Sequence, residues 1–237
     1  MRNWPFPRHA ISAVRRASIV AEFGDAPPAN RPSWRIANAE TARPRLYVYD
    51  VIGGWDLDAS GFVQAVNEIP DDAEAIDLHI NSPGGFVYDA VAMYEALSDH
   101  PAPVHVHVDG LAASAASFLA QIGESRDIAK AGRVMIHDAQ VMAWGSPADL
   151  REAADLADAV SDDISGYYAD RAGGKPGDWR AAMTATTWYS AAEAVDAGLM
   201  DAVKKRKTSG DDAGEDDDGP DNRSRVLRAR ARITLGG

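Results

Sequence analysis

The sequence predicts an α/β domain built on a mostly parallel sheet. Short apolar runs typical of strands alternate with segments of helical periodicity, and glycine-rich turns join two of the strands to the helices that follow. The strands are expected at residues 46–52, 76–80, 104–108, 133–138 and 199–203. Ligands bind at the carboxyl ends of the strands in such sheets, so the functional site is expected where the turns meet.

The helices are predicted from apolar residues that recur at helical spacing. They are expected at residues 57–69, from residue 87, at 118–122, from 147 to Gly173, at the short segment ending at Met183, and at 191–197. Two of them begin with capping boxes, Ser146 with Asp149 and Ser190 with Glu193. The long helix from residue 147 carries one apolar stripe, which can be buried within its own domain or against a second subunit.

Composition places the chain among ordinary globular proteins. Its 237 residues are enough for one domain with appendages, and 46% of them are hydrophobic. Cysteine is absent, which excludes a disulfide framework and thiol chemistry and fits a cytosolic protein. No window approaches the roughly 20 apolar residues of a membrane span, so no contact with a membrane is expected.

The two ends differ from the centre in composition. Residues 1–44, rich in Arg, Pro and Ala, are interpreted as an N-terminal extension, either flexible or a detachable pro-segment, and not as a secretory signal. Residues 45–206 form the predicted folded domain. Residues 207–237 carry an acidic run and then a basic tail, a pattern typical of solvated, disordered segments, and nucleic-acid binding is not indicated.

The stretch at residues 110–117 is the first candidate for chemistry. It follows the predicted strand 104–108 and precedes a predicted helix, so Gly110 can make the turn and Ser114 lies at a strand-to-helix corner. A hydroxyl at the positive end of a helix can act as a nucleophile, because helix-terminal N–H groups stabilise a developing oxyanion. Small residues around a serine also mark a tightly packed helix, so this stretch alone leaves both interpretations open.

Two further stretches favour the catalytic interpretation. Residues 81–85, Asn-Ser-Pro-Gly-Gly, follow the strand at 76–80 and present backbone N–H groups through their two glycines. His137 lies at the far end of the strand at 133–138. All three features are expected at the same end of the sheet, which brings a serine, a histidine and backbone donors together.

The order of these motifs resembles the ClpP family of serine peptidases. The resemblance is carried by residues 80–85, 110–114, 135–137 and 189–194, with Gly198 and Leu199, and it extends from about residue 46 to residue 203. Residues 47–50, 112–117 and 187–191 are similar to the phage branch of that family, the head maturation (prohead) proteases. The resemblance implies an α/β fold of the ClpP/crotonase type, a β-β-α spiral with a layered, mostly parallel sheet.

The resemblance also implies roles for individual residues. Ser114 would be the nucleophile and His137 the general base that takes its proton. The backbone N–H groups of Gly84 and Ala115 would form the oxyanion hole. It implies neither a metal nor a cofactor, and the sequence has no phosphate-binding Gly-x-x-x-x-Gly-Lys run and no His-Glu-x-x-His zinc motif.

The third member of the triad departs from the family pattern. The family has an acid at the position that Thr186 occupies here. Thr186 or a backbone carbonyl could orient His137, or Asp178 or Asp170 could reach in from a neighbouring element. Asp138 is a poorer candidate, because neighbours along a strand point to opposite faces. Loss of catalysis is the remaining alternative.

These observations favour an endopeptidase that cleaves capsid or scaffold protein during phage head maturation, with self-cleavage as a further option. The family implies a ring-shaped homo-oligomer, located in the bacterial host cytoplasm or the prohead, and ATP-driven unfolding would need a separate partner. The alternative is a catalytically weak or inactive homologue that acts as a prohead scaffold or assembly protein. An acyl-CoA enzyme of the crotonase fold ranks last, because it would not need Ser114 and His137 together.

Overall fold

The computed structural model of the chain describes residues 34–39, 41–53 and 59–204. Most of the predicted N-terminal extension, the first two residues of the helix predicted at 57–69, and the predicted acidic and basic tail lie outside the described residues. Residues 34–37, which the sequence assigns to the extension, form a strand that pairs with the folded domain.

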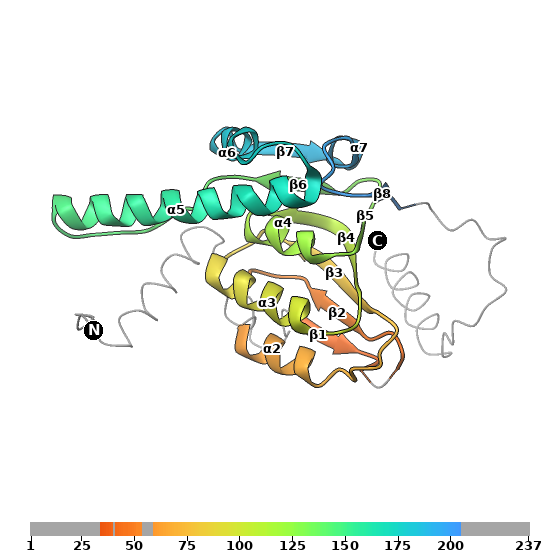
Figure 1. The fold of residues 1–237 in the computed structure, drawn as a ribbon. Helices are drawn as coiled ribbons and strands as arrows, with labels where there is room; N and C mark the ends of the chain where they lie inside the picture. Colours follow the sequence, from red (N-terminus) through yellow and green to blue (C-terminus); the bar gives the residue numbers. More distant parts are fainter. Residues whose placement is uncertain (1–33, 40, 54–58, 205–237) are drawn as a thin grey trace, which may run out of the picture. The chain divides into compact units, whose positions relative to one another are not determined.

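The described residues form one mixed sheet that is mostly parallel, which confirms the predicted α/β class. Its main path runs in the order β1-β2-β3-β4-β5-β8 (Figure 1). Only β1 is antiparallel on this path. The strands of the path are β1 (Trp34–Ala37), β2 (Arg45–Val48), β3 (Ile76–Ser82), β4 (Val104–Ala113), β5 (Ser125–Ile128) and β8 (Ala202–Val203).

Strand β4 has two partners on one side. Its first half pairs with β5, and its last residues pair in parallel with β6 (Arg133–Ile136). Strand β7 (Thr187–Ser190) then adds to β6 in antiparallel orientation. Since β4 ends at Ala113, the residue that follows, Ser114, lies directly beside the end of β6.

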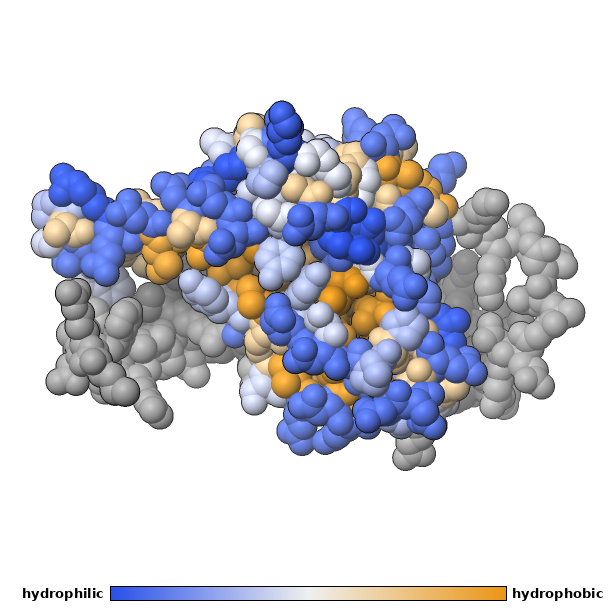
Figure 2. All heavy atoms as spheres, in the orientation of Figure 1, coloured by the Kyte–Doolittle hydropathy of each residue, from blue (hydrophilic) through white to orange (hydrophobic). Residues whose placement is uncertain are grey.

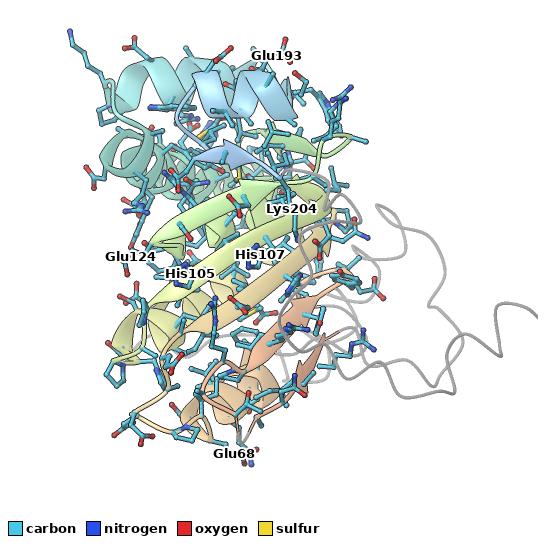
Figure 3. All side chains as sticks on the ribbon, turned by 90° about the vertical axis from the view of Figure 1, so that its right-hand side faces the viewer. Glu68, His105, His107, Glu124, Glu193 and Lys204 are labelled. Carbon is cyan, nitrogen blue, oxygen red and sulfur yellow. The ribbon has the colours of Figure 1, made fainter. Side chains whose placement is uncertain are left out.

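The helices α2 (Ala59–Asn67), α3 (Val87–Asp99) and α4 (Ala115–Leu119) lie on one face of the sheet, and a short 3₁₀ turn, η1 (Ala120–Ile122), continues α4 (Figure 1). The apolar positions of β4, such as Val106 and Val108, are fully buried in the core. His105 and His107 alternate with them, so they lie on the opposite face of the sheet, where Figure 3 shows His107 near Lys204.

The long helix α5 (Pro147–Ala172) extends beyond the rest of the domain (Figure 1). Its C-terminal part packs into the core through Ile164 and Tyr168, whereas Leu150 and Leu156 near its start are 45% and 51% exposed. Figure 2 shows hydrophobic residues along the side of α5 where it joins the domain. The predicted apolar stripe is therefore buried only in the second half of the helix.

Two short helices complete the domain, α6 (Pro176–Thr184) and α7 (Ala191–Asp196). Both predicted capping boxes are present: the Ser146 and Ser190 side chains accept from the amides of Asp149 and Glu193, whose carboxylates accept from the serine amides. In the described part of the chain, no helix is long and apolar enough to cross a membrane.

Several strands differ from the sequence prediction. The strand expected at 46–52 ends at Val48, the one at 199–203 is confined to 202–203, and β1, β5 and β7 were not predicted. Strand β5 was not predicted because a charged residue, Arg126, occupies one of its buried positions, where an apolar residue is expected. That position is possible because Arg126 donates to Asp201 and Gln121, so its charge is paired.

Candidate active site

Ser114 occupies a strained corner between β4 and α4. Its backbone has φ 54° and ψ −129°, in a region that non-glycine residues rarely adopt. The corner is held because the Ser114 amide donates to the Met135 carbonyl, at 2.9 Å, across the β4–β6 junction. Strain of this kind persists only where the surrounding structure enforces it, and it concentrates at functional sites.

The side chain of Ser114 meets His137. The distance from His137 Nε2 to Ser114 Oγ is 2.7 Å, within hydrogen-bonding range. His137 directly follows β6, so the parallel pairing of β6 with the end of β4 brings the two side chains together. When Nε2 accepts from the serine hydroxyl, the ring proton of a neutral imidazole is on Nδ1.

The Pro-Gly-Gly turn packs against the same corner. Gly84 has φ +97°, and a Cβ at this position would lie 2.5 Å from the Ala113 carbonyl oxygen and 2.6 Å from Ser114 Cβ. The turn is fixed from its other side, because the Ile52 amide donates to the Gly84 carbonyl at 2.7 Å. Only glycine allows the turn to approach the serine this closely.

Three backbone N–H groups lie at this corner. The Ala115 amide is in the first turn of α4, and the Gly84 amide donates to Ser82 Oγ at 3.1 Å. The parallel bridge between Ile52 and Gly85 turns the Gly85 N–H away from Ile52, and that N–H has no hydrogen-bond partner within the described residues. Ala115 and Gly85 thus present the amides most available to a ligand beside Ser114.

Thr186 immediately precedes β7 and lies opposite His137 in the strand register. The antiparallel register pairs Ile136 with Thr187, so the next step along the two chains sets His137 against Thr186. Thr186 is exposed, has φ 53°, and donates its amide to the Met183 carbonyl at 2.9 Å. No hydrogen bond joins its hydroxyl to His137 in the described structure.

The other candidate acids are directed elsewhere. Asp138 accepts from Arg180 Nε and from Thr184 Oγ1, both at 2.9 Å, and Arg180 also pairs with carboxylates on α5. Asp178, in the first turn of α6, and Asp170, on α5, are exposed. Neither makes a hydrogen bond to His137 among the residues described. The structure brings together Ser114, His137 and the glycine turn.

A sequence profile of the Clp protease family matches residues 64–207, which include Ser114, His137, the glycine turn and Thr186. The chain belongs to the Clp protease family. It is 31% identical over 142 residues to an ATP-dependent Clp protease proteolytic subunit 1 of Prochlorococcus marinus, covering 59% of this chain and 72% of that protein. A subunit 2 of Parasynechococcus marenigrum is 34% identical over 139 residues, which is 57% of this chain and 70% of that protein.

A third relative, the Clp protease proteolytic subunit 3 of Streptomyces coelicolor, is 31% identical over 130 residues, or 54% of this chain and 60% of that protein. The Clp protease family consists of serine-type endopeptidases, and its members form ring-shaped oligomers. The mixed, mostly parallel sheet with its helices is consistent with the ClpP-like fold that the sequence predicted.

Two serines that hold the backbone of this site in place were not predicted from the sequence as site residues. Ser82 Oγ bonds both the Gly84 amide and the Asp50 carbonyl, and Ser117 Oγ donates to the Ser114 carbonyl at 2.6 Å. Ser117 had a local signal, since it follows Ser114 by three residues at the start of a helix. Its other partner, Tyr168, lies 51 residues further along the chain, and no local pattern could indicate that contact.

Proposed function

We propose that this chain is an active serine endopeptidase in which Ser114 is the nucleophile and His137 the general base. The observation that carries the proposal is the 2.7 Å contact between Ser114 Oγ and His137 Nε2 at a strained corner. As Ser114 Oγ forms a bond to the scissile carbonyl carbon, its proton passes to His137 Nε2. The carbonyl oxygen then carries the negative charge of the tetrahedral intermediate.

The second half of the reaction uses the same two residues. The protonated His137 gives its proton to the leaving amine nitrogen as the C–N bond breaks, which leaves an acyl ester on Ser114. A water molecule then attacks the ester carbonyl and gives a proton to His137. The proton returns to Ser114 Oγ as the carboxylic acid product leaves.

Backbone donors stabilise the oxyanion in this proposal. The Ala115 N–H and the glycine turn contribute them, and Gly84 supplies the donor if its hydrogen bond to Ser82 Oγ is exchanged for one to the oxyanion. The neighbouring Gly85 N–H needs no such exchange. In other serine proteases the loss of one such donor costs about 3–4 kcal/mol of transition-state stabilisation.

The proposed site has an uncharged residue at the third position of the triad. Thr186 occupies the position of the family's acid, and Asp178, the alternative third member, is exposed on α6. A threonine has no negative charge with which to stabilise the imidazolium, and loss of that charge lowers turnover by about 10⁴-fold in a trypsin-like triad. Slow turnover is therefore the expected behaviour of the native chain.

The test is labelling with a fluorophosphonate, which reacts with activated serines, followed by intact mass. The wild type is expected to gain one adduct, and Ser114→Ala none. Ser125→Ala serves as the matched control, because Ser125 bonds His105 on the opposite face of the sheet and should label like the wild type. Labelling that persists in Ser114→Ala would overturn the assignment of the nucleophile.

The substrate we propose is capsid or scaffold protein of a phage head, with self-cleavage as part of maturation. The support is in the sequence, where residues 47–50, 112–117 and 187–191 are similar to the phage prohead branch. The experiment is co-expression of the chain with the head proteins of a phage that encodes it, in wild-type and Ser114→Ala form. New head-protein termini that appear by mass spectrometry only with the wild type support this substrate, and unchanged head proteins beside an active enzyme contradict it.

A catalytically weak or inactive scaffold protein is the second candidate, and the threonine at residue 186 is the observation that favours it. Such a protein would promote head assembly equally well with Ser114→Ala. If the chain is an endopeptidase, assembly should begin with the Ser114→Ala variant but stop before maturation. Electron microscopy of particles from the two co-expressions separates the candidates.

We also propose a ring-shaped homo-oligomer that docks through α5 and the segment before it, acting in the host cytoplasm or the prohead. The first half of α5 projects from the domain (Figure 1), and large apolar side chains on it and before it are exposed. These are Val141, Met142, Trp144, Leu150 and Leu156. Burial of such side chains against further copies would remove their apolar surface from water.

A further inference from the structure

We infer that Tyr168 and Ser117 are positioning residues, which hold the peptide unit between Ser114 and Ala115 so that its N–H faces the developing oxyanion. The inference rests on the proposed peptidase function and extends it to two residues that do not touch the substrate. Both residues are buried, and they form a chain of hydrogen bonds that ends at the carbonyl of the nucleophile.

The direction of this chain follows from the number of protons. Ser117 Oγ donates to the Ser114 carbonyl oxygen at 2.6 Å, and that bond uses the one proton of the serine hydroxyl. The distance from Ser117 Oγ to Tyr168 OH is 2.7 Å. Tyr168 must therefore donate to Ser117, and the order is Tyr168 O–H to Ser117 Oγ–H to Ser114 C=O.

The carbonyl that receives this chain belongs to the same amide as the proposed oxyanion donor. The C=O of Ser114 and the N–H of Ala115 are two ends of one planar peptide unit. Hydrogen bonds at the oxygen fix the plane of the unit and polarise it, which strengthens its N–H as a donor. The fixed plane matters here because Ser114 has φ 54°, so the unit would relax if its contacts were lost.

Tyr168 is anchored on the long helix. Its side chain is buried, and its ring lies 5.7 Å from the Trp179 ring, between α5 and α6. Trp179 is fixed in turn by a hydrogen bond from its Nε1 to the Gly173 carbonyl at 2.7 Å. Burial raises the pKa of Tyr168 above the ordinary value, so its hydroxyl keeps its proton and remains a donor throughout the working pH range.

The first test compares Tyr168→Phe, Ser117→Ala and the double variant for hydrolysis of a fluorogenic peptide. The matched control is Tyr167→Phe, because Tyr167 is the neighbouring residue, packs on Tyr94 and Phe118, and has no hydroxyl hydrogen bond in the described structure. We expect Tyr168→Phe and Ser117→Ala each to lower kcat about threefold to tenfold with KM unchanged, the range for loss of one hydrogen bond. Tyr167→Phe should match the wild type.

The double variant distinguishes positioning from two independent packing defects. If Tyr168 acts through Ser117, the double variant should be no slower than Ser117→Ala, whereas independent effects would multiply. A multiplied loss in kcat, or a loss that Tyr167→Phe shares, would overturn the inference.

A second measurement does not depend on activity. Hydrogen–deuterium exchange of peptides covering residues 110–119 should rise in Tyr168→Phe and Ser117→Ala and stay at the wild-type level in Tyr167→Phe. One outcome is that the wild type is not labelled by the fluorophosphonate although hydrogen–deuterium exchange rises in Tyr168→Phe and Ser117→Ala. The proposed function then fails, and the catalytic role of the two residues is overturned, while their structural role remains. If exchange in Tyr168→Phe equals that in Tyr167→Phe, the positioning inference fails, whatever the result of the labelling.

Discussion

Two residues in the left-handed backbone region stand on either side of His137. Ser114 is brought to it by the end of β4, and Thr186 by the start of β7. Each such conformation costs of order 1–3 kcal/mol in a non-glycine residue. The strained backbone at Ser114 places its hydroxyl on the imidazole, whereas Thr186 is opposite His137 in the strand register and lacks the charge that an acid would supply.

Replacement of Thr186 by an acid is expected to raise activity. In Thr186→Asp a carboxylate would lie opposite His137 in the strand register and stabilise the imidazolium. We expect fluorophosphonate labelling at least about tenfold faster than in the wild type, a part of the 10⁴-fold effect of such a carboxylate elsewhere. Ala185→Asp is the control, since it adds the same charge one residue away. Equal rates in the two variants would mean that residue 186 is not a position from which an acid supports His137.

Residue 84 must be a glycine for two reasons: its close approach to Ser114 and its positive φ angle. In Gly84→Ala the new Cβ would overlap the Ala113 carbonyl and Ser114 Cβ, at φ +97°. We expect labelling of Ser114 to be abolished and the free energy of unfolding to fall by about 2–4 kcal/mol, the range for overpacking with backbone strain. Labelling rates and denaturant unfolding curves measure the two effects.

Gly166→Ala provides the matched control for that substitution. A Cβ at residue 166 would meet nothing within 4 Å, and the position is inside α5. This variant should gain about 0.5–1 kcal/mol of stability, because alanine favours a helix over glycine. A Gly84→Ala protein that stays stable and reactive would show that the turn can retreat from the serine.

At the scale of the elements, the sequence was sufficient wherever a local pattern determined the structure. The capping boxes at Ser146 and Ser190, the glycine turn at residues 84–85 and the strand-to-helix corner at Ser114 all depend on neighbours a few residues apart. The prediction failed for β5, where pairing with Asp201, 75 residues away, allows Arg126 to be buried. A charged residue at a buried strand position can be predicted only when the distant residue that pairs with it is known.

The same limit applies to the candidate site. Ser114, His137 and the glycine turn could be placed together because parallel strands end at one edge of the sheet. Tyr168 could not, since its contact with Ser117 depends on how α5 packs against α4. The sequence identified the residues on strand ends and predicted α5 itself, but not the contact by which α5 supports the site.

The face of the sheet opposite α3 carries a network of titratable groups. His79 stacks between Tyr47 and His107, with ring centroids 4.7 Å and 4.8 Å apart. His79 Nδ1 lies 2.7 Å from Asp109, and His107 Nε2 lies 3.5 Å from Asp77. His107 Nδ1 is buried without a hydrogen-bond partner among the described residues.

This network predicts a fall in stability on mild acidification. Burial lowers the pKa of His107, and the charges of His79 and Lys204 lower it further, against the opposing effect of Asp77. The unfolded chain, with a histidine pKa of about 6.5, then binds the proton more tightly than the folded chain does. The contribution of neutral His107 to the free energy of unfolding is therefore fully present above the histidine pKa of the unfolded chain. It is lost as the pH falls below that pKa.

Denaturant unfolding at several pH values between 7.5 and 5 measures the effect. In His107→Gln, whose glutamine cannot be protonated in this range, the free energy of unfolding should depend less on pH than in the wild type. His105→Gln is the control, because it replaces a histidine on the same face of the same strand. The pKa values of Asp77 and Asp109 lie below the usual range, since their hydrogen bonds outweigh burial. Their contributions are therefore lost only at more acidic pH. An unchanged slope in His107→Gln would remove His107 as the source.

At the scale of the whole molecule, the projecting half of α5 is the feature that the isolated domain does not explain. Helix α5 has 26 residues, so it is about 39 Å long, yet only its C-terminal part is packed in the core. The same helix presents Tyr168 to the nucleophile corner through Ser117. A subunit contact on its outer half and the active site on its inner half would thus share one rigid element.

The test of this arrangement is to place charge on the exposed apolar side chains. In Leu150→Asp/Leu156→Asp, two residues that are 45% and 51% exposed in the isolated chain become acidic, and burial of unpaired carboxylates in an interface is costly. We expect analytical ultracentrifugation to show a shift from the assembled ring toward smaller species at micromolar protein. Ala148→Asp adds the same kind of charge at an exposed position on the side of α5 away from Leu150 and should assemble as the wild type does. If the leucine variant keeps the full ring, docking does not use the outer half of α5. If it dissociates and kcat falls while the fold is intact, assembly and catalysis are coupled through this helix.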